Sequence, residues 1–198
     1  GTKFIGNSAI QTGGAIYSAA SRLMIQNSSF LSNVANYHGA ISCKYGGIMV
    51  LLGCLFRKNV AQDGAGGIHI SYSECLQRAN SDKSDCPVIQ RKIEVFIHNS
   101  NFIQNIANEG GAVQIVNVYN CSIAKTSFVA NKAISGGIWL KIKSSLELIN
   151  CYFVSNQMQK KGGAVYIEID QKKQTSLLIY NCSFNNNTAG INGGGIHI

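Results

Sequence analysis

The chain has 198 residues, of which 45% are hydrophobic and 13% are charged, so it is long enough for a domain with its own core and too apolar for a disordered tail. Seventeen lysines and arginines against nine acids give a net charge of +8. The basic residues are scattered rather than clustered, which argues against a nucleic-acid site, and 21 glycines with a single proline indicate many tight turns.

A Phe followed three residues later by an Asn recurs along the whole chain. Successive phenylalanines are about 26 residues apart, with longer steps from Phe56 to Phe102 and from Phe153 to Phe184. A repeat of this length without helical periodicity predicts a solenoid in which equivalent residues stack into ladders and the phenylalanines are buried. The copies are Phe4/Asn7, Phe30/Asn33, Phe56/Asn59, Phe102/Asn105, Phe128/Asn131, Phe153/Asn156 and Phe184/Asn187.

The first predicted strand of each coil begins with glycines eight to ten residues after the Phe, as in GGAIY at 13–17 and GGIWL at 136–140. Inward and outward side chains alternate along such a strand. The outward column carries the single Trp of the chain, and the long insertions follow the same strand, so we expect this column to be an exposed face that binds ligand. Its members are Tyr17, Ser42, His69, Gln114, Trp139, Tyr166 and His197.

Two more short strands of period two follow in each coil, and the second of these carries the Phe. Asn and Gly tolerate left-handed backbone, so the residue three before the Phe predicts a corner between two sheet faces. The expected fold is all-β: a right-handed parallel β-helix over residues 1–198, with about seven coils of roughly 26 residues and three short strands per coil. The corner residues are Asn27, Gly53, Asn99, Lys125, Asn150 and Asn181.

The paired Phe-x-x-Asn and Gly-Gly-Ala-(Ile/Leu/Val) tetrapeptides resemble those of the polymorphic outer membrane proteins of chlamydiae. Similar repeats occur in large surface proteins of protists. Three coils depart from the strict tetrapeptide, with HGAI at 38–41, GGIH at 66–69 and GGGI at 193–196. The resemblance implies a surface-exposed β-helix, similar to an autotransporter passenger with an adhesive role.

The one large insertion, residues 71–92, is expected to protrude from the solenoid as a loop. Cys75 and Cys86 bracket a polar stretch within it and predict a disulfide, hence an oxidising compartment. Five other cysteines fall on inward positions, where burial as small hydrophobic side chains is favoured over disulfides. These are Cys43, Cys54, Cys121, Cys151 and Cys182.

The sequence shows no convincing catalytic constellation. The nine acids fall on different faces or in loops, and the nearest approach to a pair is Glu168 with Asp170. His69 and His197 occupy equivalent positions in coils too far apart to share a metal ion, while His38 and His98 look isolated. We therefore expect no enzyme activity, no cofactor and no metal site.

Four Asn-x-Ser/Thr sequons are candidates for glycosylation in a secreted protein. Register places one of them on an outward position and one in a loop, whereas the other two lie at corners and are poorer candidates. Asn120 is the outward position, Asn186 lies in the loop, and Asn27 and Asn181 are the corner residues.

The leading functional hypothesis is an extracellular or cell-surface structural and adhesive solenoid, either part of a longer surface protein or a subunit of a head-to-tail filament. Its expected partners are further coils or other copies joined end to end, because the sequence opens and closes in mid-coil. The alternative is a carbohydrate-binding module or a degenerate polysaccharide lyase or hydrolase that uses the aromatic column. The sequence contains no apolar stretch of the length that spans a membrane.

Overall fold

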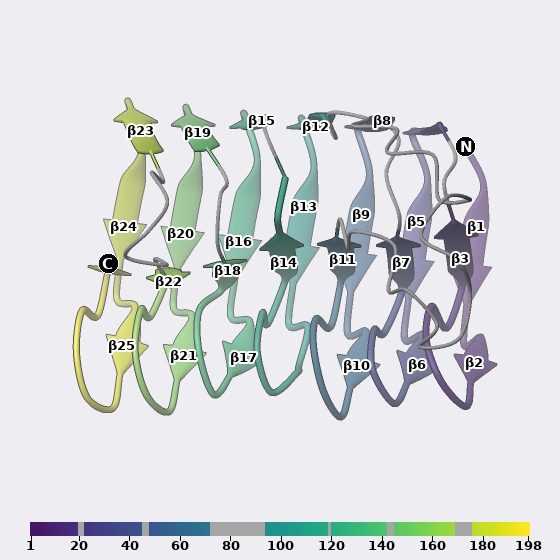
Figure 1. Ribbon diagram of the computed structural model, residues 1–198, viewed down its shortest axis with the longest axis horizontal. Coiled ribbons are helices and arrows are strands. Elements are labelled where there is room, and N and C mark those ends of the chain that lie inside the picture. The colour runs from purple at the N-terminus through teal and green to yellow at the C-terminus, as the bar shows by residue number, and fades with distance from the viewer. Residues whose placement is uncertain (20–21, 45–47, 72–93, 119, 142–144, 169–175) are drawn as a thin grey trace, which may run out of the picture.

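The computed structural model describes residues 1–19, 22–44, 48–71, 94–118, 120–141, 145–168 and 176–198. In these ranges the chain forms strands and no helix, and every strand pair is parallel. The chain winds as a right-handed parallel β-helix, as predicted, with its two ends at opposite ends of the stack (Figure 1). Within these ranges no helix has the length and hydropathy needed to cross a membrane.

Each coil contributes one strand to each of two seven-stranded sheets. The Phe sheet carries the phenylalanine of every repeat, and the Gly-Gly sheet follows the glycine-rich turns. The Phe sheet consists of β1 (Lys3–Ile5), β5 (Ser29–Leu31), β9 (Leu55–Arg57), β13 (Asn101–Ile103), β16 (Ser127–Val129), β20 (Tyr152–Val154) and β24 (Ser183–Asn185). The Gly-Gly sheet consists of β3 (Ile16–Ala19), β7 (Ile41–Lys44), β11 (Ile68–Ser71), β14 (Val113–Val116), β18 (Ile138–Lys141), β22 (Val165–Glu168) and β26 (Ile196–His197).

A six-stranded middle sheet lies between these two in chain order. Its strands are β4 (Leu23–Gln26), β8 (Ile48–Leu52), β12 (Glu94–His98), β15 (Asn120–Ala124), β19 (Ser145–Ile149) and β23 (Ser176–Tyr180). Strand β11 pairs with β7 and β14, and β12 pairs with β8 and β15. The 71–92 insertion therefore leaves the ladders on both sides in register, although residues 72–93 lie outside the described ranges.

The three predicted strands of the coil are present, and a further two-residue strand follows six of the seven Phe-x-x-Asn turns. These short strands are β2 (Ser8–Ala9), β6 (Val34–Ala35), β10 (Val60–Ala61), β17 (Lys132–Ala133), β21 (Gln157–Met158) and β25 (Thr188–Ala189). Single bridges from Ile106 to Val60 and Lys132 join their two groups into one short sheet. Two residues are too few to show a period-two pattern, so these short strands leave no signal in the sequence.

The phenylalanines form the ladder that the repeat predicts. Consecutive rings are 4.6–5.0 Å apart between centroids and within 6° of parallel. This spacing matches that of the hydrogen-bonded coils, and burial of each ring contributes roughly 1.5–3 kcal/mol. The five inner rings are fully buried, whereas Phe4 and Phe184 in the end coils are partly buried.

The asparagines of the repeat form a second ladder, which ties the coils together at the turn. Asn59 Nδ2 donates to Phe30 O at 3.0 Å and to Asn105 Oδ1 at 2.9 Å. Its own Oδ1 accepts from the backbone N and the Nδ2 of Asn33. The same bonds recur from coil to coil, so the buried amides are satisfied and hold each turn above the next.

The glycine pairs are required by close approach of the backbones of neighbouring coils. A Cβ on Gly14 would lie 2.3 Å from the carbonyl oxygen of Gly39, and a Cβ on Gly39 would lie 2.3 Å from that of Gly66. No side chain fits at such distances, so these glycines let successive turns stack at β spacing.

Candidate functional site

The outward column of the Gly-Gly sheet has the expected register. His69 pairs with Ser42 and Gln114, and Trp139 pairs with Gln114 and Tyr166. The prediction that this column is exposed is wrong for four of its members. Ser42, His69, Gln114 and Trp139 are at most 7% exposed, Tyr166 and His197 are half-buried, and Tyr17 is 50% exposed.

Polar residues from the turns before the strands pack over part of this column. The ring of His38, which precedes β7, contacts that of His69, with centroids 3.7 Å apart and the ring planes tilted by 31°. His69 Nδ1 donates to Gln114 Oε1 at 2.5 Å, and Gln114 Nε2 donates to Glu109 Oε2. The expectation that His38 is isolated is therefore also wrong, because the turn folds back over the outer face of the sheet.

Burial of the two histidines of this cluster favours their neutral forms at neutral pH. The pKa of His38 is lowered to about 2, mainly by burial and further by the charges of His69 and Lys44. Burial lowers the pKa of His69 to about 3, against the opposing effect of its bond to Gln114. Thr12 Oγ1 lies 2.6 Å from His38 Nδ1, so this ring nitrogen has a hydrogen-bond partner inside the cluster. Two buried rings in mutual contact, each with a hydrogen-bond partner, form a structural support rather than an exposed binding face.

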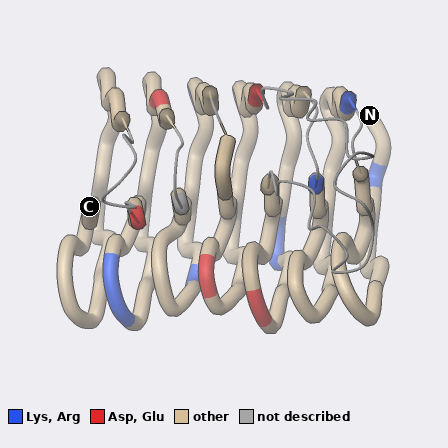
Figure 2. The backbone as a smooth tube through the Cα atoms, viewed as in Figure 1, with Lys and Arg blue, Asp and Glu red and all other residues tan. Residues whose placement is uncertain are grey.

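The nearest approach to a carboxylate pair in the sequence is Glu168 with Asp170. Asp170 lies outside the described residues, so its relation to Glu168 is not seen. Within the described ranges no group of three or more His, Cys, Asp and Glu side chains could hold a metal ion. His69 and His197 are four strands apart in the Gly-Gly sheet, as their register predicts. The acids and bases of the described chain are sparse and dispersed along the stack (Figure 2).

The five inward cysteines are free thiols, as favoured from their register. Cys43, Cys54, Cys121 and Cys151 are buried, and burial raises the pKa of each of these thiols, that of Cys151 to about 11. Such thiols stay protonated and unreactive at neutral pH. Cys75 and Cys86 lie outside the described residues, so their disulfide stays a prediction.

All four sequon asparagines are exposed: Asn27, Asn120, Asn181 and Asn186. The distinction between good and poor candidates therefore finds no support in exposure. Their occupancy stays a prediction.

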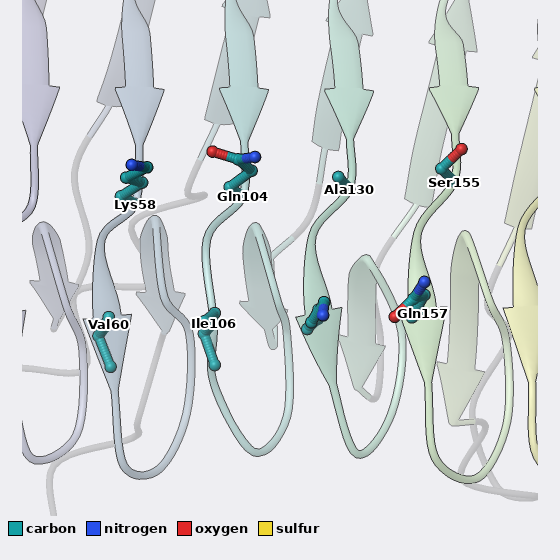
Figure 3. Close-up of a pocket in the computed structure, with 8 residues that line it drawn as sticks. Lys58, Val60, Gln104, Ile106, Ala130, Ser155 and Gln157 are labelled. Carbon is teal, nitrogen blue, oxygen red and sulfur yellow. The ribbon is translucent and has the colours of Figure 1, made fainter.

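A groove that the sequence analysis missed runs along the corner between the Phe sheet and the short sheet (Figure 3). It has a volume of about 550 Å³ and spans four coils. A neighbouring hollow of about 370 Å³ shares Ile106, Lys132 and Gln157 with it. The lining residues come from two rows, one on each side of the ladder asparagines: Lys58, Gln104, Ala130 and Ser155, and Val60, Ile106, Lys132 and Gln157.

The backbone makes this corner concave. The residue before each ladder asparagine has left-handed φ, between 53° and 56° at the four groove positions. The chain therefore bends sharply at each of these positions, and the two rows of lining residues flank the bend on the side that faces solvent. Gly6 and Asn186 occupy the equivalent place in the end coils, and these residue types were the one available signal of a second corner.

The groove is basic and hydrogen-bonding. Lys58, Lys132, Gln104 and Gln157 are exposed, and none of its lining residues is an acid. Ile106 is 45% exposed and gives the floor an apolar patch. The arrangement supplies two cations and several amide groups along a line parallel to the solenoid axis.

Three segments, residues 1–19, 150–168 and 181–198, match the Chlamydia polymorphic membrane protein repeat. The resemblance expected from the tetrapeptides is thus confirmed at the level of the repeat, which is that of a surface-associated outer-membrane family. Over 154 residues, 77% of its length, the chain is 25% identical to the metabotropic glutamate receptor-like protein R of Dictyostelium discoideum. The chain spans about 8% of that relative. No solved structure matches.

Proposed function

We propose that this chain is a structural and adhesive module of an extracellular or cell-surface protein. The observation that carries the proposal is a repeat similar to that of a surface family, folded into continuous ladders with a fully bonded asparagine spine. Such a solenoid displays a long, rigid surface, which suits adhesion better than catalysis.

Surface display is tested in cells that produce the parent protein. Antibodies raised against the purified chain should label intact cells, and protease added outside should remove the label. Labelling seen only after permeabilisation would contradict the location. Adhesion is tested separately, with beads that carry the chain expected to attach to cells more often than albumin-coated beads; equal attachment would contradict the adhesive role.

The non-enzymatic part of the proposal has its own measurement. Incubation with acidic polysaccharides should yield no unsaturated sugar ends and no new reducing ends. The alternative, carbohydrate binding through the aromatic column, loses its support because Trp139 is 5% exposed.

A further inference from the structure

We infer that the corner groove binds an extended polysaccharide that carries a repeating anionic group. The inference deepens the adhesive role and rests on it for its biological meaning. The groove runs along the axis over four coils, so it fits a linear chain better than a compact ligand. Its two lysines and lack of acidic lining residues supply the complementary charge.

The spacing of the groove residues supports a periodic ligand. Coils repeat every 4.8 Å or so, and Lys58 and Lys132 belong to coils two apart, so they are offset by roughly 10 Å along the axis. The row positions between and beyond them carry Gln104 and Gln157, whose amides can bond hydroxyl groups. A chain of alternating acidic and hydroxyl-bearing sugars presents groups of both kinds at regular intervals.

The groove is also preorganised. Lys58 and Val60 flank Asn59, and Gln104 and Ile106 flank Asn105. Both asparagines are fully buried and bonded to the coils on either side. Because the backbone of each row is fixed by this ladder, binding requires little ordering of the main chain.

The other linear ligands fit less well. Nucleic acid binds such grooves by stacking its bases on aromatic side chains, and no aromatic side chain lines this one. A peptide that adds a strand needs an open sheet edge, whereas the groove lies between two sheets whose strands are paired along its length.

The test uses the purified chain and three probes: heparin for sulfate groups, polygalacturonate for carboxylates and neutral dextran. At least one acidic polysaccharide should bind, dextran should not, and rising salt should weaken binding. The groove variant Lys58→Gln/Lys132→Gln should bind about tenfold more weakly. Both replacements copy the residue of the next coil, Gln104 and Gln157, so the fold should be kept.

The matched control is Lys3→Ser/Lys125→Asn, which also removes two positive charges, but at positions outside the groove lining. Ser29 and Asn150 occupy these places in the next coils. This variant should bind within about twofold of the unaltered chain. Equal loss in both variants, equal binding of dextran, or equal binding of polyglutamate or single-stranded DNA would overturn the inference. A failure of bead adhesion with intact polysaccharide binding would instead contradict the proposed cellular role alone.

Discussion

Phe102 lies at the middle of the ring ladder, 4.8 Å from Phe56 and 5.0 Å from Phe128 between centroids. Phe102→Ala should lower the free energy of unfolding by about 3–5 kcal/mol, because it leaves a cavity that the neighbouring coils cannot close. Chemical denaturation followed by circular dichroism measures the change. The control is Phe96→Ala on the outer face of β12, where the ring is half-buried; an equal loss in both variants would contradict the ladder's central role.

Asn105 shows that a polar residue can be as deeply embedded as the rings. Asn105→Ala removes partners from the backbone N of Asn59 and from Phe56 O, so it should cost about 3 kcal/mol. Thermal melting compared with Asn101→Ala, an exposed asparagine two positions before the end of β13, tests this. If the two variants melted together, the asparagine ladder would not be a source of stability.

At the scale of strands and turns, the histidine cluster joins β7, β11 and β14 and makes stability depend on pH. Both folded pKa values lie below the ordinary value of about 6.5, so the unfolded chain takes up protons that the folded chain does not. The contribution of the two neutral histidines to the free energy of unfolding is fully present above about pH 6.5. It should fall as the pH drops toward 3, by up to about 1.4 kcal/mol per pH unit for each histidine.

The variant His38→Ala/His69→Gln isolates this effect. Ala65 and Gln114 hold the equivalent places in the next coil, so neither replacement is foreign to the fold. Between pH 7 and 5 the unaltered chain should lose melting temperature faster than the variant. Parallel curves would mean that other groups govern the acid response.

The repeat made the sheets predictable, and the turns explain what was not. The Phe, Asn and inward cysteine positions follow from a ladder in which every coil repeats its neighbour, and the structure confirms them. The burial of Trp139 could not be predicted from strand alternation. Alternation separates inward from outward side chains, but it does not show which turn covers the outer face of the sheet. The groove was missed for a related reason: its rows are single residues on either side of an asparagine, too short to form a pattern.

At the scale of the whole solenoid, we expect the edges of the coil stack to determine how the isolated chain associates. Among the strands that the structure describes, β23 and β24 each have one neighbour in their sheets. Leu178 and Tyr180 on β23 are 53% and 66% exposed. An open edge of this kind, with apolar side chains and no charge on the strand, pairs readily with another parallel strand. We therefore expect the isolated 198-residue chain to associate end to end as its concentration rises.

Leu178→Lys places a charge on that edge and should shift the chain toward the monomer, since Lys on an edge strand opposes pairing. Tyr152→Lys is the control, because Tyr152 is similarly exposed, at 56%, but lies on β20, which has a strand on each side. Sedimentation velocity over a range of concentrations measures both. Association that persists equally in the two variants would assign the contact to a face of the solenoid, and a monomer at every concentration would exclude end-to-end pairing of this chain.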